Sequence, residues 1–135
     1  MTALAPYAGA AGRVLLAFMY VFSGVGKIFA YSGTAGYMAA FGVPGALLPL
    51  VIIVEIVAGV MIAIGYQTRL AALALAGFTL VAALIFHNNL ADQMQMILFL
   101  KNLSLTGAFL FLFANGPGEL ALDTRKQGLK LSAAS

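Results

Sequence analysis

The sequence contains no cysteine, no tryptophan and few charged residues. Without cysteine the chain can form no disulfide, no thiolate metal site and no thiol relay, so any redox role needs a cofactor or a partner protein. Charged residues make up 8% of the chain and hydrophobic residues 63%, whereas soluble domains average about 25% charged. These proportions exclude an ordinary soluble domain and predict a single small membrane domain over residues 1–135.

The small excess of positive charge, a net +3, comes largely from Arg125, Lys126 and Lys130 near the C-terminus. Such a short basic tail is typical of an anchor to anionic lipid on the cytoplasmic side of a membrane. A nucleic-acid surface would need far more positive charge. We therefore expect the lipid bilayer as a partner, and no nucleic acid.

Apolar residues are gathered into four runs, at about residues 13–31, 47–65, 70–87 and 94–114. About twenty mostly apolar residues cross a bilayer as a helix, so each run predicts a membrane span. A cleaved signal peptide is the competing interpretation of the first run, but Lys27 interrupts it and no small-residue cleavage site follows. The tail, residues 115–135, begins with the helix-breaking NGPGE, and its polar part, residues 119–135, is expected to be partly frayed.

The connections between these runs define the expected fold. GYQTR, residues 65–69, is so short that the second and third spans must be antiparallel neighbours. Residues 32–46 are too short and too rich in glycine to span, but GYMAAF within them can form about a turn and a half of interfacial helix. The predicted fold is all-α: an integral membrane four-helix transmembrane bundle with a short interfacial helix between spans one and two.

Lysine and arginine are distributed unevenly over the loops. With four spans, Arg13, Arg69 and the basic tail share one side, while the loops at residues 32–46 and 87–93 contain no lysine or arginine. The positive-inside rule then places both termini in the cytoplasm.

Each predicted span carries one ionisable group in its outer half. Glu55 lies about 12 Å and Lys101 about 10 Å from the outer ends of their spans at 1.5 Å per residue. Because lipid rejects such groups, we expect them to converge inside the bundle. The predicted ligand-binding pocket is lined by Tyr20, Ser23, Lys27, Glu55, His87, Lys101 and Asn102. The glycines expected to let helices approach closely are Gly24, Gly59, Gly77 and Gly107.

Each of these residues also has a structural interpretation. Lys27 and Lys101 can extend to the headgroups, Glu55 can bond another helix, and His87 can cap a helix end. Arg13 and Arg69 can be simple positive-inside anchors. One histidine and one glutamate beside two ammonium groups make a poor metal site, so no metal is expected. The predicted pocket contains two potential cations, Lys27 and Lys101, and one potential anion, Glu55. It therefore suits an anionic ligand, or a neutral acceptor that becomes anionic on reduction.

The order of several short motifs resembles the DoxX family of small four-span bacterial inner-membrane proteins. The matching pieces are GRVLLAFMYVFSGVGK (residues 12–27), FGVP (41–44), the lone Glu55, GYQTR (65–69), the pairs His87–Asn88 and Lys101–Asn102, and NGPGELALD (115–123). The family's recurrent polar positions map onto Arg13, Lys27, Glu55, Arg69, His87, Lys101 and Asn102.

The resemblance implies a fold more firmly than an activity. The family is named for its similarity to a membrane subunit of a thiosulfate:quinone oxidoreductase, and members are linked with oxidative-stress complexes. The first hypothesis is therefore a quinone-linked redox subunit, with no covalent cofactor and with a membrane or peripheral redox protein as partner. The alternatives are a non-catalytic scaffold or assembly subunit, including a homo-oligomer, and a small-anion transporter, which four spans disfavour.

Overall fold

The computed structural model describes residues 3–125 of the chain. Four helical segments in this part are long and apolar enough to cross a membrane, which confirms the predicted all-α four-helix membrane fold. The first span is α1, Ala5–Phe29, and the last two are α5, Thr68–Phe86, and α6, Gln93–Asn115. The second span is continuous but changes its helix type, in the order η1 (Gly45–Leu47), α3 (Leu48–Ile53), η2 (Val54–Ala58) and α4 (Gly59–Ile64). A further helix, α2 (Tyr31–Ala40), lies between the first two spans.

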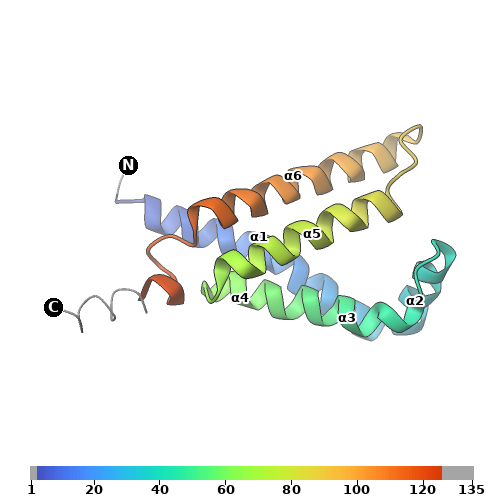
Figure 1. Ribbon diagram of the computed structural model, residues 1–135, viewed down its shortest axis with the longest axis horizontal. Helices are drawn as coiled ribbons and strands as arrows, with labels where there is room; N and C mark the ends of the chain where they lie inside the picture. The colour runs from blue at the N-terminus through green and yellow to red at the C-terminus, as the bar shows by residue number, and fades with distance from the viewer. Residues whose placement is uncertain (1–2, 126–135) are drawn as a thin grey trace.

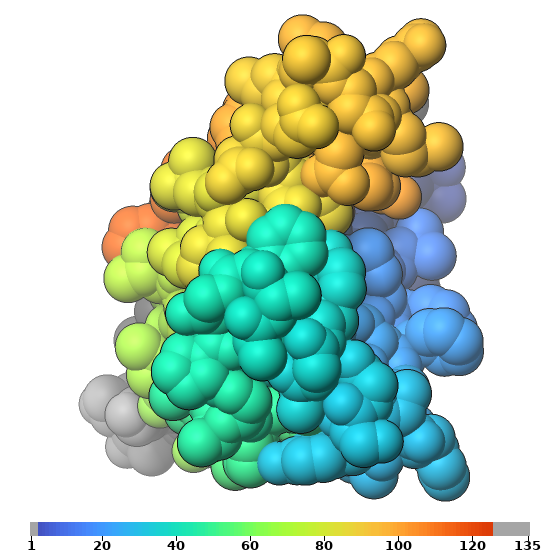
Figure 2. Space-filling view, turned by 90° about the vertical axis from the view of Figure 1, so that its right-hand side faces the viewer, coloured from blue at the N-terminus to red at the C-terminus, as the bar shows by residue number. Residues whose placement is uncertain are grey.

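Successive spans run in opposite directions (Figure 1). The start of α1, the turn between α4 and α5, and the end of α6 therefore lie at one end of the molecule. Helix α2 and the loop between α5 and α6 lie at the other end, and α5 and α6 run side by side along their length. Figure 2 looks onto this second end and shows α2 lying across its middle, against the residues of α5.

The helix ends follow from local sequence. Asp92 caps α6 because its carboxylate accepts from the backbone N–H groups of Met94, at 2.9 Å, and Gln95, at 3.4 Å. Span two ends at Gly65, which has φ +73°, a left-handed conformation that glycine adopts without strain. This turn lets the chain reverse within GYQTR, as its short length predicted.

The core is built largely from small residues. Its buried cluster consists of Ala17, Tyr20, Ala58, Ile62, Ala71, Ala72, Leu75, Ala76 and Phe109. Large apolar side chains instead point outward, and Phe29, for example, is 87% exposed. Small residues inside and large ones outside are expected of a bundle whose surroundings are lipid.

Three details differ from the sequence-based expectation. Helix α1 begins at Ala5 rather than near residue 13, with Pro6 in its first turn, where proline is well tolerated. Helix α2 is longer than the predicted turn and a half. Gly77 and Gly107 do not mediate close packing, since a Cβ added at either would meet nothing within 4 Å.

Candidate functional site

Span two winds into a π-helical turn, η2, where it carries Glu55. Such a turn places an extra residue in the helix and is frequently found at functional sites. Glu55 is 3% exposed and faces α1, which approaches closely because Gly24 has no side chain. A Cβ added at Gly24 would lie 2.6 Å from Ile56 Cγ1 and 3.3 Å from Glu55 Cβ. The predicted close approach at Gly24 is confirmed, and it brings α1 onto the acid.

Lys27 on α1 is the ion-pair partner of Glu55. Its Nζ lies 2.7 Å from Glu55 Oε1 and also donates to Ser23 Oγ at 2.6 Å. The contact with Glu55 is electrostatic, since none of the described donors meets Oε1 in hydrogen-bond geometry. The Lys27 side chain remains 26% exposed and that of Glu55 4%. Pairing a carboxylate with an ammonium lowers the cost of holding both in a bilayer.

A second polar group joins three spans beside this pair. The Tyr20 hydroxyl lies 2.5 Å from Thr79 Oγ1, and Asn102 Nδ2 donates to the Thr79 carbonyl at 3.3 Å. Tyr20 is buried and its ring packs edge-on against Phe109, with ring centroids 5.3 Å apart. Thr79 thus links α1, α5 and α6.

These two groups border one cavity of about 480 Å³. Its polar lining consists of Tyr20, Ser23, Lys27, Thr34, Tyr37, Glu55, Thr79, His87 and Asn102. Its apolar lining includes Met19, Met38, Leu47, Leu50, Val51, Phe78, Val81, Ile85 and Phe86. The volume lies within the range of about 300–1,000 Å³ that is usual for small-molecule sites.

Helix α2 covers one side of the cavity through an aromatic cluster. Tyr37 of α2 stacks on Phe86 at the end of α5 with centroids 5.4 Å apart, and Phe41 contacts both rings at 4.9 and 5.2 Å. Thr34, Tyr37 and Met38 of α2 are part of the lining. The link between spans one and two is therefore part of the site.

Of the seven predicted pocket residues, six lie around this cavity and Lys101 does not. His87 lies at the end of α5, where its Nδ1 is 3.2 Å from Gln95 Oε1. Lys101 is exposed on α6, so the expected convergence of one ionisable group from each span is wrong for α6. Residues 101 and 102 are adjacent, and adjacent residues on a helix point about 100° apart, so only Asn102 faces the cavity.

Sequence reasoning missed Thr79 and the α2 residues as parts of the site. Thr79 is the only polar side chain between Leu70 and Phe86, and that isolation was a usable signal. The contribution of α2 had no comparable signal, because α2 carries no charged residue and the position of its side chains depends on the tertiary fold.

The opposite end of the bundle is held together by a different set of polar contacts. Arg13 is 3% exposed and donates to the carbonyls of Ile62 and Ala63 at 3.0 and 3.1 Å, and to that of Leu120. Buried in this way, Arg13 caps the C-terminal end of α4, a structural role in addition to the one expected of a positive-inside anchor.

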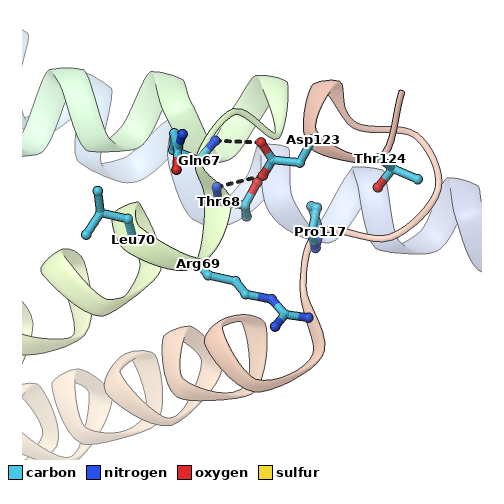
Figure 3. A pocket seen from close by; sticks show the side chains of 7 residues that line it. All are labelled: Gln67, Thr68, Arg69, Leu70, Pro117, Asp123 and Thr124. Carbon is cyan, nitrogen blue, oxygen red and sulfur yellow. Dashed lines mark hydrogen bonds between the residues drawn. The ribbon is translucent and has the colours of Figure 1, made fainter. Parts of the chain in front are cut away.

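The segment after α6 returns to the turn between α4 and α5 (Figure 3). The Asp123 carboxylate accepts from the backbone N–H groups of Gln67 and Thr68 at 2.7 and 2.8 Å, which caps the start of α5. Arg69 lies beside Gly116, and residues of both segments line a small pocket of about 370 Å³. The described part of the tail that was expected to be partly frayed, residues 119–125, is thus held to the start of α5 through Asp123, while residues 126–135 lie outside the described part.

Four apolar spans around a largely apolar cavity with a few polar groups define the class of this molecule, a polytopic α-helical membrane protein. The DoxX family model matches residues 8–88, more than half of the sequence, and the chain belongs to the DoxX family. The resemblance inferred from the motifs is thereby confirmed.

Two proteins of Escherichia coli (strain K12) are similar to this chain along most of their length. The chain is 46% identical to "Inner membrane protein YqjF" over 111 residues, which cover 82% of the chain and 85% of that protein. It is 35% identical to "Inner membrane protein YphA" over 120 residues, covering 84% and 86%. No solved structure matches the chain. The chain is a DoxX-like inner membrane protein.

Proposed function

We propose that the cavity beside Lys27 and Glu55 binds a quinone-type ligand, and that the protein serves as a membrane subunit of a redox system. The observation that carries this proposal is the state of the Lys27 ammonium. It has three N–H donors, of which one donates to Ser23 Oγ, while Glu55 is its ion-pair partner without hydrogen-bond geometry. Ser23 is the one hydrogen-bond partner of Lys27 among residues 3–125, and Lys27 lines the cavity, so a donor is available to a ligand carbonyl.

The cavity also suits a ligand that arrives through the lipid. Leu50 and Val81 belong to its lining and yet are 58% and 53% exposed on the outside of the bundle. In a bilayer these side chains border both the lipid and the cavity. An apolar molecule can therefore enter laterally and keep an apolar tail in the lipid while a polar ring reaches Lys27.

The lining residues divide into complementary roles. A quinone accepts two electrons and two protons when it is reduced. Lys27 donates to its carbonyl oxygen and stabilises the negative charge that develops there. Glu55 and His87 both line the cavity, and they are the groups through which the two protons would be delivered to the quinone oxygens. Because the chain has no cysteine, we expect a partner protein rather than a thiol of this chain to supply the electrons.

Photo-crosslinking tests this proposal directly. A photoactivatable quinone analogue is added to the purified full-length protein in detergent, and the labelled peptides are mapped. We expect the label on Met19, Met38 and Val51 of the lining, and protection when unlabelled quinone is in excess. Label confined to outward side chains such as Phe111, or label that excess quinone does not reduce, would contradict a quinone site.

A scaffold subunit remains the second candidate function, and one observation favours it. The Lys27–Glu55 pair joins α1 to η2, so the charges also stabilise the bundle. Under this hypothesis, replacing either residue lowers the amount of folded protein and affects no ligand. Variants that keep full thermal stability but lose ligand binding would exclude the scaffold hypothesis.

We further propose that both termini are cytoplasmic, so that the cavity lies in the outer half of the membrane. The start of α1 and the described end of the chain lie at the same end of the molecule (Figure 1). Arg13, Arg69 and Arg125 also belong to that end, whereas the loops at the cavity end contain no lysine or arginine. This asymmetry agrees with the positive-inside rule.

A further inference from the structure

Lys101 is an uncompensated charge within a membrane span. It lies eight residues after Gln93, the first residue of α6, which is about 12 Å along the helix axis. Its side chain is exposed on the outside of the bundle and has no hydrogen bond or ion pair with any of the described residues. An ammonium held there against hydrocarbon is costly, so a partner group is expected.

The described membrane spans have no free carboxylate to pair with Lys101. Within the four spans of the described residues, Glu55 is the only acid, and it is buried and paired with Lys27. A second copy of the chain would have the same shortage, because its Glu55 is equally enclosed. The missing countercharge therefore has to come from a different molecule.

The face of α6 beside Lys101 has the form of a helix-packing surface. Leu100, Ser104, Gly107 and Phe111 follow one another at helical spacing and are all exposed. A Cβ at Gly107 would meet nothing within 4 Å, so the middle of this face is open. Among the four spans, α6 is the least buried, since it packs mainly on α5. Small residues in such a stripe let a second helix approach closely.

We propose that this face of α6 docks a transmembrane helix of another protein, and that this helix carries an aspartate or glutamate at the level of Lys101. The carboxylate would pair with the ammonium, and the open surface at Gly107 would receive the backbone of the partner. Charge complementarity in lipid makes the contact selective, because a helix without the acid leaves Lys101 unpaired. This inference does not depend on which ligand the cavity binds.

Energy transfer between labelled helices in vesicles tests the proposal. The full-length protein is reconstituted in phosphatidylcholine with a synthetic leucine-rich transmembrane helix that carries one glutamate at the matching depth. An otherwise identical helix with glutamine is the control. We expect the glutamate helix to associate about tenfold more strongly with the wild type than with Lys101→Met. The glutamine helix should show no difference between the two proteins.

A charge-reversal variant at Lys101 distinguishes loss of the ion pair from loss of folding. Because Lys101 is exposed, Lys101→Glu should fold and should prefer a lysine-bearing helix to the glutamate helix. If the wild type binds the glutamate and glutamine helices equally, or if Lys101→Met binds the glutamate helix as well as the wild type does, the ammonium reaches the headgroups and the proposal is wrong. Self-association of the wild type that Lys101→Met abolishes would identify a second copy as the occupant and would also overturn it.

Discussion

Lys27 Nζ of α1 lies 2.7 Å from Glu55 Oε1 in the π-helical turn of span two. The pair is asymmetric, because the Lys27 side chain is 26% exposed and that of Glu55 only 4%. Removing either charge leaves the other one unpaired inside the bundle, whereas removing both leaves a neutral contact between α1 and η2. The pair therefore couples the stability of the bundle to the chemistry of the cavity that both residues line.

The first prediction concerns this coupling. Glu55→Gln and Lys27→Met should each lower the free energy of unfolding, by up to about 3–5 kcal/mol, because each leaves an unpaired charge. The double variant should recover much of that loss. Equilibrium unfolding in mixed micelles measures the cycle, and Lys101→Met combined with Glu55→Gln is the matched control, expected to be additive within about 0.5 kcal/mol. A double variant as unstable as the sum of its singles would disprove the pairing.

Gly24 provides the second prediction. Gly24→Ala should destabilise the protein by about 1–3 kcal/mol, because the added methyl group would lie 2.6 Å from Ile56 Cγ1, where α1 and η2 are in contact. Gly107→Ala is the control, since its Cβ would meet nothing within 4 Å and alanine favours the helix by about 0.5–1 kcal/mol. Thermal melts of the two variants in the same detergent test the contrast. Equal effects at the two positions would show that α1 and η2 are not closely packed.

The third prediction concerns the contact between the C-terminal segment and α5. Asp123→Ala should cost about 0.5–2 kcal/mol, since its carboxylate caps the start of α5 through the N–H groups of Gln67 and Thr68. Asp123→Asn should lose less, because asparagine is also an effective cap. Unfolding free energies measure both, with Glu119→Ala, at an exposed position of the same segment, as the reference. If Asp123→Ala and Glu119→Ala are indistinguishable, the segment does not stabilise α5.

The fourth prediction concerns membrane orientation, which single introduced cysteines can report because the chain has no cysteine of its own. Single cysteines at Asn89, in the loop between α5 and α6, and at Glu119 would each be the sole thiol of the protein. An impermeant maleimide applied to intact cells should label Asn89→Cys, and should label Glu119→Cys only after the inner membrane is opened. The reverse pattern would place the cavity on the cytoplasmic side.

Several of these features were predictable from residue pattern alone. Four apolar runs and the short GYQTR turn are local signals, and they predicted the spans and their antiparallel order. Glu55 was recognisable as a residue that needs a partner on another helix, with Lys27 and Lys101 as the candidates, because lipid disfavours unpaired charge. The choice between Lys27 and Lys101 was not predictable, since it depends on the rotation of α6, which is set by the packing of Asn102, Thr106 and Phe109.

Other features arise from tertiary contacts that no local pattern encodes. The π-helical turn at Glu55 has no sequence signature, and Arg13 looked like an anchor because its acceptors are carbonyls of a distant helix. The cap formed by Asp123 joins residues more than fifty positions apart along the chain. Such contacts become visible only once the spans are assembled.

The central claim is that the Lys27–Glu55 pair belongs to a ligand site. Equilibrium titration of the purified protein with a short-chain quinone analogue tests it most directly, using the wild type, the double variant Lys27→Met with Glu55→Gln, and Lys101→Met. The account predicts saturable binding by the wild type and by Lys101→Met, and loss of binding by the double variant while its thermal stability stays near that of the wild type. Absence of saturable binding by the wild type, or equal affinity in the double variant, would contradict it.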